Sequence, residues 1–206
     1  MDDAVTINQL AYDLDQIYRD CWHRLVNGVH SAKSAFHTPA IASINNGFPE
    51  IRTVVLRKAL PEQQQLIFHS DVRSPKIKQI QSNPALSWLF YDDKAKIQLR
   101  IKSQASLHHL NELSQSRWNE SRLQSRSCYL VEPAPSVVSA KATDGYPAGF
   151  NRNELNEASL LPGYAHFVVV VCQVLEIDWL YLNHDGHRRA RFVLDEIGVS
   201  KNWLVP

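Results

Sequence analysis

The sequence predicts a mainly β protein with helices, of the α+β class, built as a closed or half-closed antiparallel barrel with helical additions. Two observations lead to this prediction. Apolar and polar residues alternate in about seven segments joined mostly as hairpins, and helical spacing appears only at the start and in the middle of the chain. The length of 206 residues, 44% of them hydrophobic, suffices for one sizeable core or two small ones, and we predict a single domain over residues 1–206.

The opening segment, within residues 1–35, is expected to form an amphipathic helix. Apolar residues recur there at the i, i+4, i+7, i+8 spacing of one helical face, while charged residues occupy the other face. The apolar positions are Leu10, Leu14, Ile17, Tyr18, Cys21, Trp22, Leu25 and Val26.

Strand-type alternation begins after Thr38, and Asn46-Gly47 is a strong signal for a hairpin turn. Ser74-Pro75 predicts the start of a short helix that runs to about Asn83, because serine caps helices and proline suits the first helical position. The strands are expected at 39–45, 50–59, 66–70, 85–92, 96–107, 165–182, 187–196 and 202–206.

The second half of the chain contains the helical insertion and the most apolar strand. Helical spacing returns over about 107–130, which predicts one or two helices. Prolines and small polar residues predict a long loop over 133–163 with one helical turn near 151–158, and loops of this length are usually functional or mobile. The apolar run 165–182 predicts a bent strand or two strands in succession.

The net charge and the cysteines limit the kinds of partner and the cellular compartment that we expect. Basic residues number 22 and acidic residues 21, so the net charge of +1 would not draw the whole molecule to nucleic acid or an anionic membrane. The three cysteines form no CxxC pair, the acidic N-terminus does not resemble a signal peptide, and no apolar run approaches the roughly 18 residues of a membrane span. These features predict a cytoplasmic protein without nucleic-acid or membrane partners.

Two neighbouring segments are candidates for binding an anion. Arg52 and Arg57 lie on opposite faces of one predicted strand, and a guanidinium fork suits a phosphate. The loop after the 66–70 strand opens a helix whose free N–H groups, with Arg73 and Lys76, favour an anion. Solvated arginines and an ordinary capped helix are the alternatives, but the closeness of the two segments allows a hairpin to bring them together.

Other polar residues give weaker signals. Gln98 lies on an alternating strand, where its amide can donate and accept as an isoalloxazine or pyrimidine edge requires; a solvated strand face is the alternative. The basic cluster at 187–191 is small for a nucleic-acid surface, and we predict no metal site at His184 and His187. No GxSxG, HExxH or GxxxxGK motif is present, so the corresponding hydrolase, metalloprotease and nucleoside-triphosphatase templates do not apply.

Several short segments, in this order, resemble the pyridoxamine 5′-phosphate oxidase-like FMN-binding split barrels. The match covers about residues 36–130 and 163–206 and is closer to a poorly characterised FMN-binding branch than to the oxidases proper. The segments are RTVVLR at 52–57, LIFHS at 66–70, SPK at 74–76, QIQSNP at 79–84, LSWLFY, KIQLRI, the Arg-rich RWNESRLQSRSCYLVEPAPS at 117–136, WLYL, RARF and the final NWLVP. The resemblance implies an FMN-binding split β-barrel with an N-terminal helix and a helical insertion, and a homodimer because such proteins bind FMN between two subunits.

The resemblance also implies a set of site residues, carried over position by position. Arg52, Ser74 and Lys76 would hold the FMN phosphate. Arg122, His187 and Arg189 would face the substrate, and no catalytic residue is assigned. The residues that would surround the flavin and ribityl chain are Val54, Val55, Leu56, Arg57, Phe68, His69, Gln98, Tyr164 and Arg191.

This chain departs from the oxidases where they bind their substrate. Arg57 replaces a lysine, Pro75 replaces an arginine, and 187–190 replaces an Arg-x-His-Asp segment. A Tyr-x3-Arg-x3-Ser phosphate clamp falls on Trp118, Arg122 and Arg126. The sequence therefore predicts an FMN-dependent oxidoreductase that transfers hydride between FMN and an unknown small anionic substrate. The alternatives are a genuine pyridoxamine or pyridoxine 5′-phosphate oxidase and a non-catalytic flavin- or haem-binding protein, for which His69 or His187 would be the haem ligand.

Overall fold

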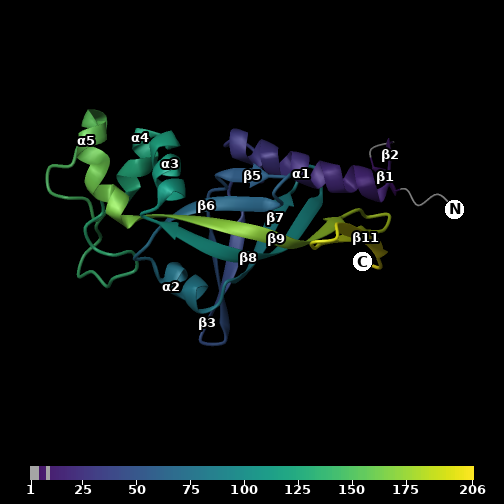
Figure 1. Ribbon diagram of the computed structural model, residues 1–206. Helices are drawn as coiled ribbons and strands as arrows, with labels where there is room; N and C mark the ends of the chain where they lie inside the picture. The colour runs from purple at the N-terminus through teal and green to yellow at the C-terminus, as the bar shows by residue number, and fades with distance from the viewer. Residues whose placement is uncertain (1–4, 8–9) are drawn as a thin grey trace.

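The computed structural model describes residues 5–7 and 10–206 (Figure 1). The helices are α1 Leu14–His30, α2 Pro75–Ser82, α3 Glu112–Glu120, α4 Leu123–Arg126 and α5 Glu157–Leu160, with short 3-10 turns η1 Ser127–Tyr129, η2 Arg152–Glu154 and η3 Leu161–His166. The strands are β1 Val5–Ile7, β2 Leu10–Tyr12, β3 Ala40–Asn45, β4 Phe48–Thr53, β5 Lys58–Leu60, β6 Gln65–Asp71, β7 Ala85–Asp92, β8 Ile97–His109, β9 Phe167–Tyr181, β10 Arg188–Leu194 and β11 Val199–Leu204.

The long strand β9 organises the main sheet because it changes neighbours along its length. On one side it pairs with β8 almost throughout; on the other it pairs with β6 over 167–173 and with β10 over 176–181. The ladder between β8 and β9 is irregular between Lys102 and Ser103, close to the change. All pairings are antiparallel, and the sheet continues from β8 through β7 and β3 to β4. The sheet therefore splits into two branches, one ending at β5 and the other at β11.

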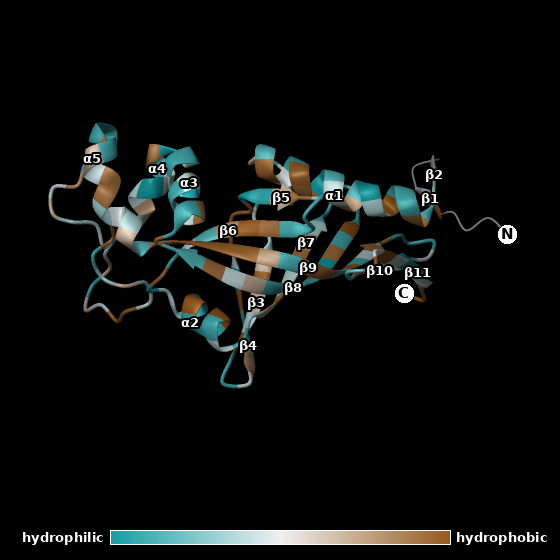
Figure 2. Cartoon of the chain, in the orientation of Figure 1, coloured by the Kyte–Doolittle hydropathy of each residue, from teal (hydrophilic) through white to brown (hydrophobic). Residues whose placement is uncertain are grey.

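The main hydrophobic core lies inside this curved sheet and under α1. Strands β7, β8 and β10 bury alternate residues, and teal and brown stripes along the strands in Figure 2 follow this alternation. The buried face of α1 consists of Ile17, Cys21, Trp22, Leu25 and Gly28. The α+β class and the antiparallel split-barrel architecture expected from the sequence are confirmed.

A second hydrophobic cluster lies at the other end of β9, under a helical cap formed by α3, α4, α5, η1 and η3. Phe167 and Val169 of β9 are fully buried there with Trp118 of α3 and Leu160 of α5. Figure 1 shows this cap at the end of the sheet opposite β10 and β11. Because β9 buries both faces in this half, its sequence is a continuous apolar run rather than an alternation.

Several local predictions agree with the structure. Asn46 and Gly47 have φ values of 49° and 82°, as the turn between β3 and β4 requires. The helix α2 begins with Pro75 after Ser74, and α5 and η2 provide helical turns in the predicted 133–163 loop. The run 165–182 forms one strand, β9. No helix in residues 5–7 and 10–206 is long and apolar enough to span a bilayer.

Three predictions of local structure need correction. The expected strand 50–59 is interrupted: β4 ends at Thr53 and β5 begins at Lys58, because the chain crosses from pairing with β3 to pairing with β6. Leu10, expected on the first helix, belongs to β2, and α1 starts at Leu14 after the capping residue Asp13. The described chain has eleven strands rather than about seven.

Candidate functional site

Arg52 of β4 points toward α2 and is surrounded by polar side chains. Its Nη1 donates a hydrogen bond to Ser43 Oγ at 2.5 Å. Its Nη2 donates to Gln79 Oε1 at 3.1 Å and to Glu50 Oε2 at 3.0 Å. Gln79 lies on α2 and is buried, as is Ser43 on β3, so two different elements fix the direction of the guanidinium.

Lys76, in the first turn of α2, lies close to Arg52. Its Nζ donates to Ser74 Oγ at 2.7 Å and to Ser70 Oγ at 3.1 Å, and both serines are buried. Burial, followed by the positive charge of Arg52, lowers the pKa of Lys76, while Asp71 opposes this shift. The fold therefore holds two cations near each other and partly out of water.

We call this group the Arg52–Lys76 cluster: Ser43, Arg52, Ser70, Ser74, Lys76 and Gln79. Three of the five guanidinium N–H groups and two of the three ammonium N–H groups make the hydrogen bonds given above. Within the part of the chain that the structure describes, N–H donors therefore remain on both cations. Glu50 offsets one of the two charges. An oxyanion with two negative charges would fit this arrangement, because it would accept the remaining hydrogen bonds and relieve the repulsion between the cations.

Arg73 does not join the cluster, which corrects the prediction that it acts with Lys76. Its guanidinium forms a bidentate ion pair with Asp71, with distances of 3.0 Å and 2.7 Å. It also donates to the carbonyl oxygens of Val131 and Glu132. Arg73 thus ties the start of the long loop to the segment between β6 and α2.

A cavity of about 390 Å³ lies on the other side of β6, between the end of α1 and the helical cap. Arg57, Lys58, Arg117 and Arg122 contribute four cations to its wall, against the single carboxylate of Glu120. The remaining lining residues are Val29, His30, Ala32, His37, Leu56, His69, Ser121 and Ser125. The excess of positive charge favours an anionic ligand.

The charges in this cavity are unevenly neutralised. Glu120 pairs with Arg117 at 2.8 Å and with Lys58 at 3.5 Å. Within the described residues, neither Arg57 nor Arg122 has a carboxylate within ion-pair distance. The two arginines are therefore the cations in the cavity wall that are available to an anionic ligand.

His69 reaches the same cavity from β6. Burial, and next the charge of Arg57, lowers the pKa of His69 to about 3, so the imidazole is neutral at physiological pH. Its ring packs against Phe167 with the centroids 4.8 Å apart, and its buried Nε2 has no hydrogen-bond partner among the described residues. A buried nitrogen without a partner costs free energy, which a ligand that bonds to it would recover.

The predicted flavin-lining residues on β6 and between β4 and β5 have different environments. The segment Val54–Arg57 joins the cluster to the cavity: the Val54 N–H donates to Pro39 O and the Leu56 N–H to His37 O. Val54 and Val55 are half-buried there. Phe68, in contrast, is 0% exposed in the main core, with its ring edge-on to Trp88 at 5.6 Å, so it packs in the protein interior and does not line the cavity.

Gln98, Arg189 and Arg191 lie on the outer face of the sheet, at the end formed by β8, β9 and β10. Asp178 accepts hydrogen bonds from Arg189 at 2.7 Å and from Arg100 at 2.6 Å. These two arginines hold the pKa of Asp178 below its usual value although burial acts against them. Arg191 is exposed and stands opposite Asp178 and Asn202 in the strand ladders.

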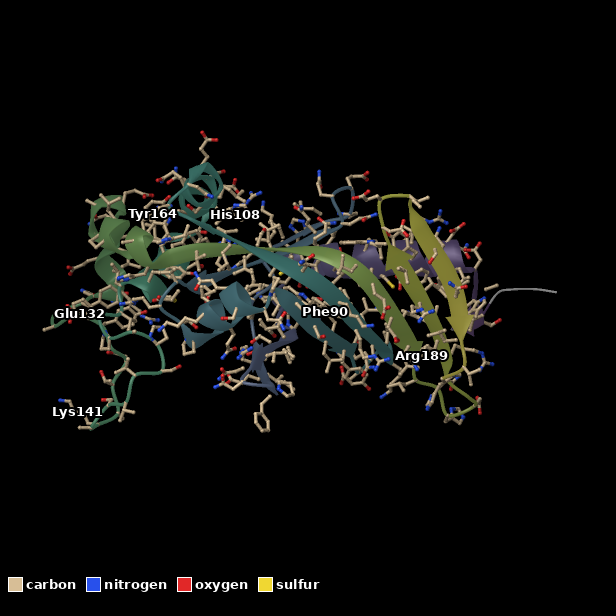
Figure 3. All side chains as sticks on the ribbon, turned by 60° about the horizontal axis from the view of Figure 1, so that its bottom comes forward. Phe90, His108, Glu132, Lys141, Tyr164 and Arg189 are labelled. Carbon is tan, nitrogen blue, oxygen red and sulfur yellow. The ribbon has the colours of Figure 1, made fainter. Side chains whose placement is uncertain are left out.

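Tyr164 and His187 lie away from both groups within one chain. The Tyr164 hydroxyl is 3.0 Å from Ser114 Oγ in the helical cap. Figure 3 shows Tyr164 and Arg189 at opposite ends of the sheet. His187 is exposed in the turn before β10, where its Nδ1 accepts a hydrogen bond from the Asn183 N–H. Tyr164 and Arg191 of the same chain therefore do not converge on one ligand.

The phosphate clamp that the resemblance places on three helical residues is not assembled. Arg122 lines the cavity, but Trp118 is only 2% exposed in the second hydrophobic cluster. Arg126 is turned away from the cavity toward Glu157 and the end of α3. Only one of the three residues can contact a ligand there.

Sequence reasoning did not assign a role to Ser43 or Gln79, which complete the Arg52–Lys76 cluster together with Ser70, the first residue of the loop predicted to bind an anion. Serine and glutamine are common on strands and helices and carry no distinctive spacing.

These features define a class of protein: an antiparallel split barrel with a two-cation cluster at a helix start and a separate cationic cavity. Residues 19–109 match a family model described as pyridoxamine 5′-phosphate oxidase, FMN-binding domain. Over these residues the chain is similar to the pyridoxamine 5′-phosphate oxidase-like proteins, as the resemblance in its sequence predicted. None of the curated proteins compared with this sequence matches it.

Solved structures with the same fold cover most of the chain. A pyridoxamine 5′-phosphate oxidase-related, FMN-binding protein from Nostoc punctiforme is 22% identical, with a TM-score of 0.71 over 91% of this chain and 96% of the other. PhzG from Burkholderia lata is 14% identical, with a TM-score of 0.66 over 98% and 100% of the two chains. A protein related to general stress protein 26 from Clostridium acetobutylicum is 12% identical, with a TM-score of 0.54 over 86% and 97%. At these identities the similarity establishes the fold.

Proposed function

We propose that this protein binds FMN and uses it to oxidise or reduce a small anionic substrate. The observation that carries the proposal is the Arg52–Lys76 cluster. Two cations with unused N–H donors, held together by Ser43, Ser70, Ser74 and Gln79, fit a terminal phosphate. The family model, which is that of an FMN-binding domain, supports the same ligand.

When bound, FMN would supply hydride transfer, and the protein would supply binding, orientation and electrostatics. Arg52, Ser74 and Lys76 would hold the phosphate. The segment Val54–Arg57 leads from the cluster to the cavity and would follow the ribityl chain and the flavin. His69 would offer its buried Nε2 to a ligand in the cavity.

The substrate would occupy the cavity beside Arg57 and Arg122. Four cations against one carboxylate favour a negatively charged molecule, and the volume of about 390 Å³ fits a small one. Pyridoxamine 5′-phosphate itself is a poorer fit, because Arg126 and Trp118 do not complete a phosphate clamp.

We further propose a homodimer in which a second copy of the chain completes the site. The outer sheet face that carries Gln98 and Arg100 continues into apolar residues that are exposed in one chain. Ile44, Ile51, Leu89 and Tyr91 are 40%, 71%, 43% and 42% exposed, and their strand positions place them on this same face. Burial of this face would remove apolar surface from water and bring Gln98, Arg189, Arg191 and His187 of one copy to the flavin of the other.

The proposed compartment is the reducing cytoplasm. Cys21 and Cys172 are buried free thiols and Cys128 is an exposed one, so the described fold depends on no disulfide.

The test of the proposed function is anaerobic reduction of the purified protein. We expect the two broad absorption bands of an oxidised flavin, which are lost when NADH or NADPH is added and retained with pyridoxamine 5′-phosphate. Rapid reduction by pyridoxamine 5′-phosphate would identify a genuine oxidase instead. A single sharp haem band, or a flavin that no donor reduces, would contradict the proposal.

Arg191→Ala is expected to lower the affinity for FMN or the reduction potential of the bound flavin. The positively charged guanidinium of Arg191 from the second copy would stabilise negative charge on the reduced flavin. Substitution by alanine removes this stabilisation. Flavin titration and redox titration of the variant measure the two quantities. Arg19→Ala, which removes an exposed cation of α1, is the matched control. If affinity and potential both equal the wild-type values, Arg191 has no such role.

A further inference from the structure

Arg126 is a buried cation at the end of α4, in the helical cap. It lies near the cavity but does not line it. Its side chain is 5% exposed, and its guanidinium packs over the Trp118 ring at 5.5 Å from the centroid. An arginine buried to this extent needs partners for its charge and its N–H groups. Its side-chain partners among the described residues belong to α3, to the corner between α3 and α4, or to α5.

The first partners are carbonyl oxygens at the end of α3. The Arg126 Nε donates to Ser121 O at 2.8 Å, and Nη2 donates to Asn119 O at 3.2 Å. The last carbonyls of a helix have no partner within the helix, and a basic side chain can satisfy them. Arg126 therefore fixes the turn in which Ser121 and Arg122 connect α3 to α4.

The second partner is Glu157, at the start of α5 and within the 133–163 loop. It accepts hydrogen bonds from both terminal nitrogens of Arg126, with Nη2 to Oε1 at 3.2 Å. Glu157 is itself 74% exposed, so it contributes charge and direction at the surface rather than packing in the interior. The pair joins the end of the long loop to the α3–α4 corner.

This corner forms one wall of the cationic cavity. Ser121, Arg122 and Ser125 all line it, as do Arg117 and Glu120 in the last turn of α3. A shift of the corner would therefore move Arg122, one of the two cavity arginines that pair with no carboxylate of the described residues.

We infer that Arg126 is a positioning residue: through its bonds to Asn119, Ser121 and Glu157 it holds Arg122 at the cavity for an anionic ligand. The inference rests on the proposed function for the identity of that ligand. The contacts that fix the α3–α4 corner are independent of it.

The test compares Arg126→Met with Arg126→Lys and Glu157→Ala. In hydrogen exchange of the FMN-loaded protein, we expect Arg126→Met to speed exchange of the amides in 119–125 roughly tenfold, because several hydrogen bonds to this corner are lost, while β6 and β9 keep their protection. Arg126→Lys retains the charge and part of the bonding, so it should restore most of the protection. Glu157→Ala should give a smaller change, since the carbonyl contacts remain.

A second measurement connects the corner to ligand binding. Titration of the FMN-loaded protein with inorganic phosphate, used as an anionic probe, should show about tenfold weaker binding to Arg126→Met and partial rescue by Arg126→Lys, while FMN affinity does not change. Arg152→Met, which removes an exposed arginine that packs on Tyr146, is the control and should match wild type.

The outcomes separate this inference from the proposed function. Unchanged exchange in Arg126→Met, or faster exchange with unchanged probe affinity, would overturn the positioning role and leave the proposed function standing. A wild-type protein that binds no FMN would refute the proposed function. A wild-type protein that binds FMN but no anionic probe would overturn the role assigned to Arg126 together with the substrate cavity.

Discussion

Phe68→Ala is expected to lower the free energy of unfolding by about 3–5 kcal/mol, the range for removal of a large aromatic side chain from a core. Phe68 is 0% exposed and lies edge-on to Trp88, which in turn stacks on Phe90 at 5.9 Å. The cavity left by the missing ring would be surrounded by strands that cannot close it. Urea unfolding followed by circular dichroism measures the loss.

A second substitution at position 68 distinguishes two roles for Phe68, as a residue of the core or as a residue that contacts the flavin. A residue of the flavin wall would affect FMN affinity even when the core stays filled, whereas a core residue would not. We therefore expect Phe68→Leu, which keeps most of the volume, to retain FMN affinity and to cost less stability than alanine. A strong loss of FMN affinity in a stably folded Phe68→Leu protein would show instead that Phe68 contacts the flavin.

Arg52→Ala is expected to weaken FMN binding by about 1.5–3 kcal/mol, or roughly 10- to 150-fold, the scale of a hydrogen bond to a charged group. The variant removes one of two cations from the proposed phosphate site and leaves Ser43 and Gln79 paired with each other at 2.6 Å. The fold should survive, because Arg52 lies on the edge strand β4 and is half-buried. Fluorescence titration with FMN measures the dissociation constant.

Two further variants sharpen the interpretation of Arg52→Ala. Arg52→Lys keeps the charge but loses the planar fork, so its FMN affinity should fall between those of wild type and alanine. Arg19→Ala removes a distant exposed charge and should have no effect. An unaltered dissociation constant in Arg52→Ala would reject the assignment of Arg52 to the phosphate.

The parts of the fold that depend on local chemistry could be predicted from the sequence. Asn46-Gly47 has the positive φ values that a tight hairpin needs, Ser74-Pro75 begins α2, and the alternation in β7 and β8 marks their buried faces. The break between β4 and β5 could not be predicted in this way. It depends on a change of partner strand from β3 to β6, which is a tertiary event.

In the candidate site, too, some residues could be predicted from the sequence and others depend on tertiary contacts. The resemblance found Arg52, Ser74 and Lys76, which the structure brings close together around Ser70 and Gln79. It also placed Phe68 at the flavin, whereas the structure buries this side chain in the main core beside Trp88, a contact that no sequence spacing signals. The direction of Arg126 depends on Glu157, 31 residues further along, and no spacing in the sequence signals that contact.

The central claim is that the Arg52–Lys76 cluster recognises a phosphate, and comparison of FMN with riboflavin tests it most directly. The two ligands share the flavin and ribityl chain and differ in the phosphate alone. Wild type should bind FMN at least about 100-fold more tightly than riboflavin, and Lys76→Met should lose most of this preference by weakening FMN alone. Equal affinities for the two ligands in wild type, or a preference that Lys76→Met leaves intact, would contradict the account.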